Sequence, residues 1–343
     1  MRALIAMSGG VDSSVAALLA MEQGLNCIGA TMHLHNTACA DDAAGVAQRL
    51  GIPFYEFDCR EQFRSQVMDY FVRCYEAGGT PNPCIECNRR LKFGHLLDIA
   101  RNMGCAYVVT GHYARIELDA AGRYLLKKAE DATKDQSYFL CRLTQEQLAH
   151  TRFPLGGLTK AQAREIAEKN GFLNAKKKDS QDICFVPDGD YMAFLEDYTG
   201  KTYTAGDFLN DQGKTVGTHR GAVAYTIGQR KGLGLAMGAP VYVCGKDMAA
   251  NTITVGPNEA LFRTTLLADD WNWSAIPCPT EPLQCKAKAR SRMTEQAATV
   301  YPLPDGTARV VFDEPQRAIT PGQTVCLYDG DTVLAGGTIT EVL

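Results

Sequence analysis

The sequence contains no apolar stretch of about 20 residues, the length that a membrane-spanning helix needs. Its first residues, MRALIAMSGG, have only a short apolar run before two glycines, so we do not expect a signal peptide. The chain also lacks an excess of positive charge, because its net charge is -4. This charge disfavours a broad nucleic-acid-binding surface, so any such binding must depend on local basic clusters.

Internal repeats and low-complexity tracts are also absent, and the composition is that of an ordinary globular protein, with 45% hydrophobic and 22% charged residues. The 343 residues are enough for two or three domains. The 13 cysteines are an odd number, and without a secretory signal they predict reduced thiols in a cytoplasmic protein. We expect some of them to be catalytic or metal-bound, in a monomer that does not bind membranes.

The first part of the chain alternates strands with helices. Strands are predicted at residues 3–7, 27–33, 52–57 and 106–110, and helices at 15–23, 41–50, 91–103 and 159–170. This alternation predicts an α/β fold with a doubly wound, Rossmann-like parallel sheet.

After about Thr202 the pattern changes to short β-type runs, such as TITVG and TVCLY, that glycine, proline and asparagine interrupt. Such runs are typical of small antiparallel sheets and barrels. The turn-rich stretch at 268–279 predicts one more boundary. We therefore predict an α/β domain at 1–201, a small β-rich domain at 202–267 and a barrel-like domain at 268–343.

Residues 8–14, SGGVDSS, lie between a predicted buried strand and a predicted helix. Glycines let the backbone approach a phosphate closely, and the N-terminus of a helix favours negative charge. Ser8 and Ser13 add hydroxyl donors, and Asp12 is a candidate magnesium ligand. No lysine closes the loop, so it is not the GxxxxGK[ST] phosphate loop. A tight glycine turn before a capped helix is the structural alternative.

The SGGxDS pattern resembles the signature of the N-type ATP pyrophosphatases, which cleave ATP between its α and β phosphates and adenylylate a carbonyl oxygen. Six further segments resemble tRNA 2-thiouridylases, occur in that family's order and span nearly the whole chain. They are TPNPCIECNRRLKFG (80–94), TGHYAR (110–115), KDQSYFL (134–140), KDSQDICF (178–185), YTIGQRKGLG (225–234) and RAITPGQ (317–323).

The resemblance implies that ATP, with Mg²⁺, binds at this loop and at two neighbouring strand ends. Gly111 follows one predicted strand and Met32 ends another, at the sheet edge where open α/β sheets bind ligands. As isolated residues, both would more often be structural. The implied nucleotide contacts are Ala6, Met7, Ser8, Gly9, Gly10, Val11, Asp12, Ser13, Met32 and Gly111.

Cys87 and Cys184 stand at the positions of the family's two catalytic cysteines. Sulfur must arrive activated, as a persulfide, and a second thiol must then cleave the sulfur–sulfur bond. The resemblance implies that Cys184 carries the persulfide and that Cys87 is its partner, with a transient disulfide between them. A single cysteine is more often a small buried hydrophobic residue. That is our expectation for Cys27, Cys141, Cys244 and Cys326.

Cys84 departs from the family pattern, because many members have an aspartate there. It forms a C-x-x-C with Cys87, a spacing that suits a metal or a redox pair. A structural zinc site needs four ligands, whereas three cysteines suit a four-iron cluster with one open iron. Cys84, Cys87 and Cys184 are therefore candidate ligands of a [4Fe–4S] cluster, and persulfide transfer without a cluster is the alternative.

The resemblance also implies contacts with tRNA. The basic run at 176–178 precedes the Cys184 loop, and Arg89, Arg90 and Lys92 follow Cys87, so both are candidate phosphate contacts, with solvated surface as the alternative. The implied tRNA contacts are Asn82, Pro83, Cys84, His112, Lys134, Asp135, Gln136, Arg290, Ser291 and Gln323.

Four basic residues, Lys286, Lys288, Arg290 and Arg292, alternate with other residues, so a strand would place them on one face. Like charges repel, which makes such a face hard to explain by folding, and we predict that it contacts the tRNA backbone. Ser291 replaces the aromatic residue that the family usually has at this position.

Together these features predict a tRNA-uridine 2-sulfurtransferase. It adenylylates the C2 position of the wobble uridine and then transfers sulfur, giving 2-thiouridine, AMP and pyrophosphate. The resemblance implies the tRNAs for Lys, Glu and Gln as substrates, and a cysteine desulfurase or its relay as sulfur donor. The alternatives are another N-type ATP pyrophosphatase, such as a lysidine synthase or an amidotransferase-type synthetase, and a non-catalytic RNA-binding sulfur carrier.

Overall fold

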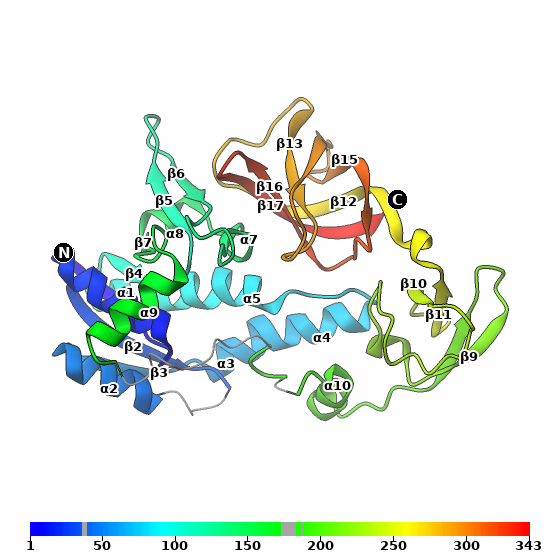
Figure 1. Cartoon of the computed structure of the whole chain (residues 1–343), viewed down its shortest axis with the longest axis horizontal. Helices are drawn as coiled ribbons and strands as arrows, with labels where there is room; N and C mark the ends of the chain where they lie inside the picture. Colours follow the sequence, from blue (N-terminus) through cyan, green and yellow to red (C-terminus); the bar gives the residue numbers. More distant parts are fainter. Residues whose placement is uncertain (36–39, 173–182, 187) are drawn as a thin grey trace.

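The computed structural model describes residues 1–35, 40–172, 183–186 and 188–343. Three β-sheets organise them: a five-stranded sheet near the N-terminus, a four-stranded sheet in the middle of the chain, and an eight-stranded sheet with the C-terminal strands (Figure 1). Within these described ranges, no helix is both long and apolar enough to cross a membrane.

The N-terminal sheet is parallel and has the strand order β3-β2-β1-β4-β7. Its strands are β1 (Arg2–Ala6), β2 (Asn26–His33), β3 (Phe54–Asp58), β4 (Tyr107–Val109) and β7 (Thr151–Arg152). The order reverses next to β1, since β2 and β3 lie on one side of it and β4 and β7 on the other. Open parallel sheets bind their ligands at the carboxyl ends of the strands beside such a reversal.

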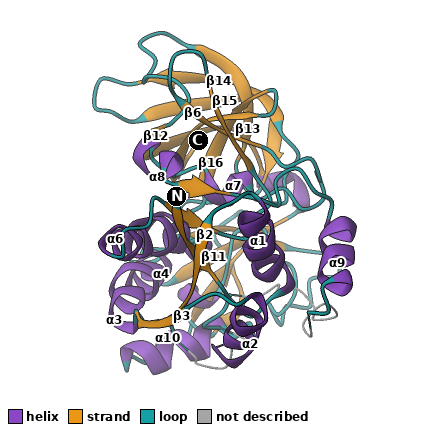
Figure 2. Cartoon of the chain, turned by 90° about the vertical axis from the view of Figure 1, so that its left-hand side faces the viewer, coloured by secondary structure: helices purple, strands orange, loops and turns teal. Residues whose placement is uncertain are grey.

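Helices cover both faces of this sheet (Figure 2). One face packs against α1 (Val11–Glu22), α2 (Ala40–Leu50) and α9 (Lys160–Lys169), and the other against η2 (Cys87–His95) and α6 (Leu96–Asn102). Ala3 and Ile5 belong to the first core and Leu4 to the second, because successive residues of a strand point to opposite faces. The predicted doubly wound α/β fold is confirmed.

A helical segment continues from the sheet toward the middle of the molecule (Figure 1). It contains α3 (Arg60–Phe63), η1 (Arg64–Met68), α4 (Asp69–Glu76), α5 (Pro83–Glu86) and η2. Pro83 is in the first turn of α5, where a missing N–H costs nothing. The helix predicted at 91–103 is therefore part of a longer run that begins at Pro83, and its π-helical part, η2, is of a kind frequent at functional sites.

The middle sheet has the order β10-β11-β8-β9 and a small core of its own. Its strands are β8 (Gly206–Leu209), β9 (Thr215–His219), β10 (Tyr242–Asp247) and β11 (Thr252–Gly256). Short helices before it are α7 (Ser137–Leu140), α8 (Gln145–Ala149) and α10 (Tyr191–Thr199).

The C-terminal strands close into a barrel, because β12 pairs with both β15 and β17. They are β12 (Phe262–Trp273), β13 (Leu283–Lys288), β14 (Gln296–Pro302), β15 (Ala308–Arg317), β16 (Thr324–Asp329) and β17 (Thr332–Val342). The hairpin of β5 (Arg115–Leu118) and β6 (Tyr124–Lys127) joins the same sheet where Lys127 pairs with Thr332. The division predicted at 267/268 falls within β12, so the strands of the barrel begin at Phe262.

Gly111, which follows β4, packs against the start of α1. A Cβ at this position would lie 2.6 Å from the backbone carbonyl carbon of Asp12 and 2.8 Å from the nitrogen of Ser13. We expect Gly111→Ala to lower the free energy of unfolding in urea by about 1–3 kcal/mol. The control is Gly45→Ala in α2, where an added Cβ meets no atom within 4 Å. Equal stability of the two variants would contradict the close approach of Gly111.

Candidate functional site

The loop after β1 has the geometry of an anion-binding turn. Gly9 has a φ of 68°, and Gly10 is the extended N-cap residue of α1; among the described residues, no side chain caps this helix end. The Ser13 hydroxyl accepts a hydrogen bond from the N–H of Ser8 (3.2 Å) and donates one to the Gly10 carbonyl oxygen (3.0 Å). The first N–H groups of the helix therefore remain for an anion, as at other phosphate-binding helix starts.

The carboxylate of Asp12, in the first turn of α1, is already engaged. Lys160 Nζ donates to both of its oxygens at 2.8 and 2.7 Å, and the Tyr113 hydroxyl donates to one at 2.8 Å. Lys160 is 8% exposed and is the first residue of α9. The cation that the loop lacks in sequence thus comes from a distant helix, whereas magnesium binding by Asp12 stays a prediction.

The other predicted nucleotide contacts lie around this edge of the sheet. Met7 and Val11 are buried, so their side chains belong to the core. Ala6 ends β1, and Met32, near the end of β2, packs against two cores. Gly111 contacts Asp12 and Ser13 of the loop, and nucleotide binding by these residues stays a prediction.

A pocket of about 530 Å³ lies between the cysteine-bearing helices and the barrel. Predicted tRNA-contacting residues line it, namely Asn82, Pro83, Cys84, His112, Gln136, Ser291 and Gln323. Tyr75, Phe139 and Tyr191 add aromatic surface, on which a nucleic-acid base can stack. The pocket is linked to the phosphate loop, because the Gln136 side chain accepts the N–H of Tyr113, whose hydroxyl donates to Asp12.

The structure brings Cys84, Cys87 and Cys184 together. Burial raises the pKa of Cys87 to about 11, and the neighbouring thiols add to the increase. Burial likewise raises the pKa of Cys84 and of Cys184, although each exposes part of its surface. Lys92 lowers the pKa of all three thiols by its positive charge. This lysine also lines the pocket, so it is the group that favours the reactive thiolate forms.

His112 is a neutral group of the pocket wall. Burial, assisted by the charge of Lys92, lowers its pKa well below the usual value. Its Nδ1 lies 2.7 Å from the Thr110 hydroxyl, and its ring packs against Phe93 and Phe153. At neutral pH it can therefore exchange hydrogen bonds with a substrate but cannot supply a positive charge to a phosphate.

Other predicted tRNA contacts have partners within the protein. Asp135 accepts hydrogen bonds from the backbone N–H groups of Ala129 and Ser137 and from the Ser137 hydroxyl. Lys134 does not line the pocket. Arg90 pairs with Glu86, at 2.5 Å.

The prediction of a continuous basic strand is wrong. β13 ends at Lys288, which pairs with Glu295 at 3.8 Å and lies over the ring of Tyr328. Arg290 lies beyond the strand and turns inward, donating to the Ile227 carbonyl oxygen and the Thr320 hydroxyl. Two of the four basic residues thus have partners inside the protein and do not share one strand face, which removes the repulsion argument for an RNA-binding face.

Sequence reasoning missed Lys160 and Tyr113, and it interpreted Lys92 only as a phosphate contact. Thr159 and Gln162 form a capping box, which marks the start of α9 but not the direction of the Lys160 side chain. Because α9 is about 150 residues from Asp12, only the packing of α9 beside α1 brings the two charges together. The spacing of apolar and polar residues along the sequence does not indicate an ion pair between two distant helices, such as that of Lys160 with Asp12.

A parallel sheet with a glycine-rich loop at a helix start defines a nucleotide-binding α/β protein, here with a pocket lined by Cys84 and linked to the loop through Gln136 and Tyr113. Three domain families match the chain in order. They are a tRNA methyl transferase HUP domain over residues 1–188, a tRNA methyl transferase PRC-barrel domain over 192–257 and an aminomethyltransferase β-barrel domain over 263–339.

The chain is also similar over its length to curated proteins named tRNA-specific 2-thiouridylase MnmA. It is 49% identical to that of Symbiobacterium thermophilum, over 100% of this chain and 93% of the relative. It is 46% identical to that of Clostridioides difficile (100% and 99%) and 49% identical to that of Moorella thermoacetica (99% and 99%). The chain therefore belongs to the tRNA-specific 2-thiouridylase family.

Similarity to solved structures is weaker. A 4-thiouridine synthetase–RNA complex with bound ATP matches with a TM-score of 0.37 and 15% identity, covering 58% of this chain and 50% of that chain. NMN synthetase from Francisella tularensis matches with a TM-score of 0.34 and 18% identity, covering 59% and 78%.

The ion pair of Asp12 predicts a role for Lys160 in nucleotide binding. We expect Lys160→Met to weaken ATP binding about 10- to 100-fold, because a charge-assisted hydrogen bond contributes about 1.5–3 kcal/mol. Isothermal titration calorimetry measures this change. Lys169→Met, at the exposed end of the same helix, is the matched control. An unchanged affinity in Lys160→Met would remove this lysine from the nucleotide site.

The charge of Lys92 predicts the reactivity of the thiols. In Lys92→Met the pKa values of Cys84, Cys87 and Cys184 should rise, so the thiolate fraction at pH 8 falls. We expect alkylation of Cys84 and Cys184 by iodoacetamide to slow about 3- to 10-fold, since one pKa unit changes a thiolate fraction about tenfold. Mass spectrometry follows each site. Lys92→Arg should keep the original rates, as should Lys214→Met at an exposed site; a slower rate in these controls would contradict a charge effect.

Proposed function

We propose that this protein is an ATP-dependent tRNA-uridine 2-sulfurtransferase that converts the wobble uridine to 2-thiouridine. The observation that carries the proposal is the proximity of Cys84, Cys87, Cys184 and Lys92, which influence one another electrostatically, at a pocket lined by Cys84 and Lys92. A lysidine synthase or an amidotransferase-type synthetase needs ATP activation but no pair of reactive cysteines. A simple sulfur carrier, conversely, has no use for the loop.

In the first half-reaction, the loop and Lys160 bind the phosphates of ATP. The O2 atom of the uracil attacks the α-phosphorus, pyrophosphate leaves, and the N3 proton is lost to solvent. The first-turn N–H groups of α1 stabilise the charge on the transferred phosphoryl group. Asp12 would be a ligand of bound magnesium, which would supply further charge neutralisation on the phosphates.

In the second half-reaction, Cys184 carries a persulfide. Its terminal sulfur attacks C2, and AMP leaves. The thiolate of Cys87 then attacks the sulfur of Cys184, so that a Cys87–Cys184 disulfide forms and the electron pair of the broken bond leaves with the sulfur on the base. A cellular thiol reductant returns the disulfide to two thiols. Lys92 supports both attacks because it favours thiolates.

A four-iron cluster is the other route that the three cysteines predict. All three lie in the described part of the chain, and the described residues contain no group of three or more Cys, His, Asp or Glu side chains arranged to hold a metal. In this arrangement the thiols do not fit a cluster, so no step of the proposal passes through one. Anaerobic purification with iron analysis tests this directly, since persulfide transfer requires no iron.

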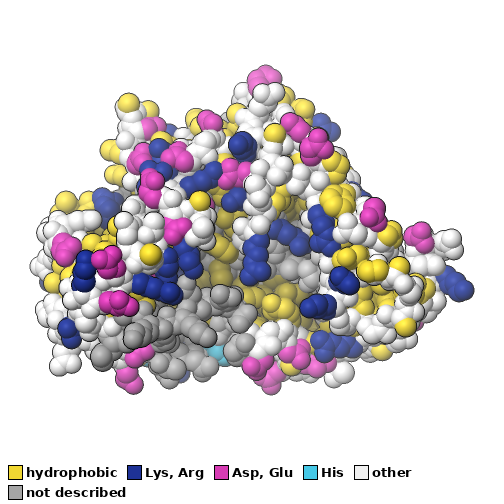
Figure 3. Space-filling view, viewed as in Figure 1, with side chains coloured by type: hydrophobic (Ala, Val, Ile, Leu, Met, Phe, Trp, Pro, Cys, Tyr) yellow, Lys and Arg dark blue, Asp and Glu magenta, His cyan; other side chains and the backbone are white. Residues whose placement is uncertain are grey.

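The substrate is a tRNA, which we propose to be the Lys, Glu and Gln isoacceptors, and the sulfur donor is a cysteine desulfurase or its relay. Lys and Arg side chains gather along the hollow between the barrel and the helices below it (Figure 3). This local charge supports phosphate binding in a protein whose net charge is -4. Residues 1–201 then carry the adenylation chemistry, and the barrel, assigned by sequence to 268–343, faces the tRNA.

In vitro thiolation of a wobble-uridine anticodon stem-loop tests the proposal. The wild-type protein should release AMP only when RNA is present. Cys184→Ser should form AMP but no 2-thiouridine, because activation precedes sulfur transfer, whereas Cys278→Ser, at an exposed thiol, should behave as wild type. AMP release at the same rate with and without RNA would refute the proposed substrate. Normal thiolation by Cys184→Ser would refute the role of this cysteine.

A further inference from the structure

Residues 80–89, which we call the thiol segment, carry Cys84 and Cys87 and are held from the barrel at both ends. The first three residues of the segment have no helical or strand structure, and α5 begins only at Pro83. The direction in which the chain enters α5 therefore depends on the groups that the backbone of residues 80–82 contacts. Those contacts come from a part of the sequence more than 200 residues away.

The first contact is made by residues 320–323, which we call the barrel loop. The Nε2 of Gln323 donates to the carbonyl oxygen of Thr80 at 2.7 Å and lies 3.5 Å from that of Pro81. In return, the N–H of Thr80 donates to the carbonyl oxygen of Pro321 at 2.8 Å. The backbone of the segment is thus hydrogen-bonded in both directions just before Cys84.

Two glycines allow this close approach. A Cβ on Gly322, which has a φ of 85°, would lie 2.9 Å from the nitrogen of Thr80. A Cβ on Gly79 would lie 3.1 Å from the carbonyl oxygen of Pro321. A side chain at Gly322 would force the barrel loop and the segment apart, because real Cβ atoms do not lie so close to a backbone nitrogen, and one at Gly79 would make an unusually tight contact.

The barrel loop is itself rigidly attached. Gly322 donates its N–H to Ile339 in β17, and Ile339 donates its own to Gln323, each at 2.8 Å. Arg290 donates to the hydroxyl of Thr320, which is fully buried, and to the carbonyl oxygen of Ile227 in the middle part of the chain. Because the barrel loop is bonded to the barrel in this way, the position of the barrel determines where the thiol segment lies.

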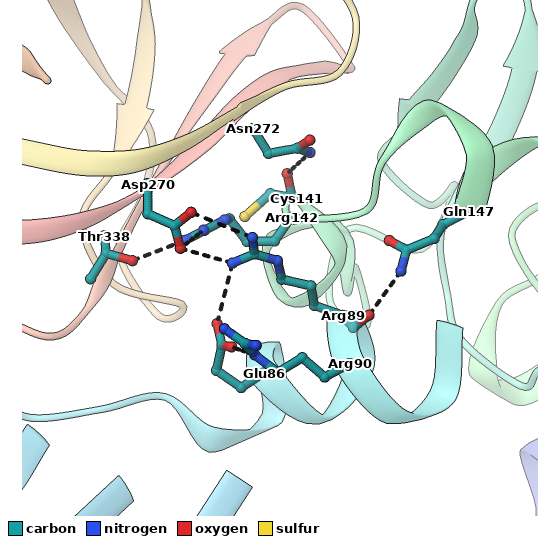
Figure 4. Close-up of polar contacts among 9 residues, drawn as sticks. All are labelled: Glu86, Arg89, Arg90, Cys141, Arg142, Gln147, Asp270, Asn272 and Thr338. Atoms are coloured by element: carbon teal, nitrogen blue, oxygen red, sulfur yellow. Dashed lines mark hydrogen bonds and ion pairs between the residues drawn. The ribbon is translucent and has the colours of Figure 1, made fainter. Parts of the chain in front are cut away.

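The second contact is an ionic network at the other end of the segment (Figure 4). Arg89, two residues after Cys87, donates to Asp270 of β12 at 2.8 Å. Arg142, which is 1% exposed, donates to the same carboxylate and to the Thr338 hydroxyl of β17. Glu86, 5% exposed and between the two cysteines in sequence, lies 4.0 Å from Arg89. Two strands of the barrel thus fix the turn of helix that carries Cys87.

We propose that Gln323 and Arg89 are positioning residues, which use the barrel to hold Cys84 and Cys87 in the geometry that sulfur transfer requires. The inference rests on the proposed sulfurtransferase activity. It gives Gln323 a task that does not depend on contact with tRNA, because its amide donates to the protein's own backbone. A displacement of about 1 Å in such a segment lowers the rate of a reaction about 100-fold without changing the binding of the substrate.

The test compares Gln323→Met, which keeps the side-chain volume but removes the donor, with Gln284→Met at an exposed position of the same barrel. We expect Gln323→Met to lower kcat for thiolation at least about tenfold, with the Kd for tRNA within about twofold of wild type. Hydrogen exchange of the peptide around Thr80 should become faster in the free protein, a readout that needs neither ATP nor RNA. Gln284→Met should change none of these values.

Arg89→Met provides a second variant for the other end of the segment. It leaves Asp270 to pair with the buried Arg142, whereas removal of Asp270 would leave a buried charge unpaired. The same loss of kcat at unchanged Kd is expected. A weaker Kd with unchanged kcat, or unchanged hydrogen exchange in Gln323→Met, would overturn the inference. If the wild-type protein itself failed to thiolate RNA, the proposed function would fail instead, while hydrogen exchange would still report on the contact.

Discussion

The contact between Gly111 and the first turn of α1 is the constraint on which the site depends. Parallel pairing of β1 with β4 places the ends of both strands at one edge, and the missing side chain of Gly111 lets the next residues follow the phosphate loop. His112 and Tyr113 then face in different directions, one into the thiol pocket and one toward Asp12. Three consecutive residues thereby connect the place where ATP is proposed to bind with the place where sulfur is proposed to move.

Burial has opposing effects at this site. It shields Cys87 from water, but it raises the pKa values of all three thiols and so disfavours the reactive thiolates. The positive charge of Lys92 counteracts this effect from the same helix that carries Cys87. The same charge lowers the pKa of His112 further, so the His112 ring in the pocket wall stays uncharged where a nucleic-acid base would lie. One lysine thus contributes to the pKa of four groups, although burial has the larger effect on each.

The sequence predicts local patterns well and distant side-chain partners badly. Alternating strands and helices, the SGGVDSS turn and the paired cysteines all have signals within a few residues, and the structure confirms the doubly wound sheet and brings the cysteines together. Asp12 pairs with a residue 148 positions away, Asp270 with one 128 positions away and Arg290 with one 63 positions away, so no local pattern indicates these partners. The basic alternation after Lys286 misled because the strand ends at Lys288. Lys288 pairs with Glu295, just before β14, and Arg290 donates to Thr320 and Ile227.

The β5–β6 hairpin has a consequence for the order of folding. It is made early in synthesis, yet its outer neighbour in the sheet is β17, the last strand of the chain, through Lys127 and Thr332. Until that strand is made, the backbone at Lys127 and Lys128 lacks its partners, and unpaired strand edges are prone to wrong association. The β5–β6 hairpin in the N-terminal half therefore needs β17 as a partner. Removal of β17 from the chain would expose the edge of β6 at Lys127.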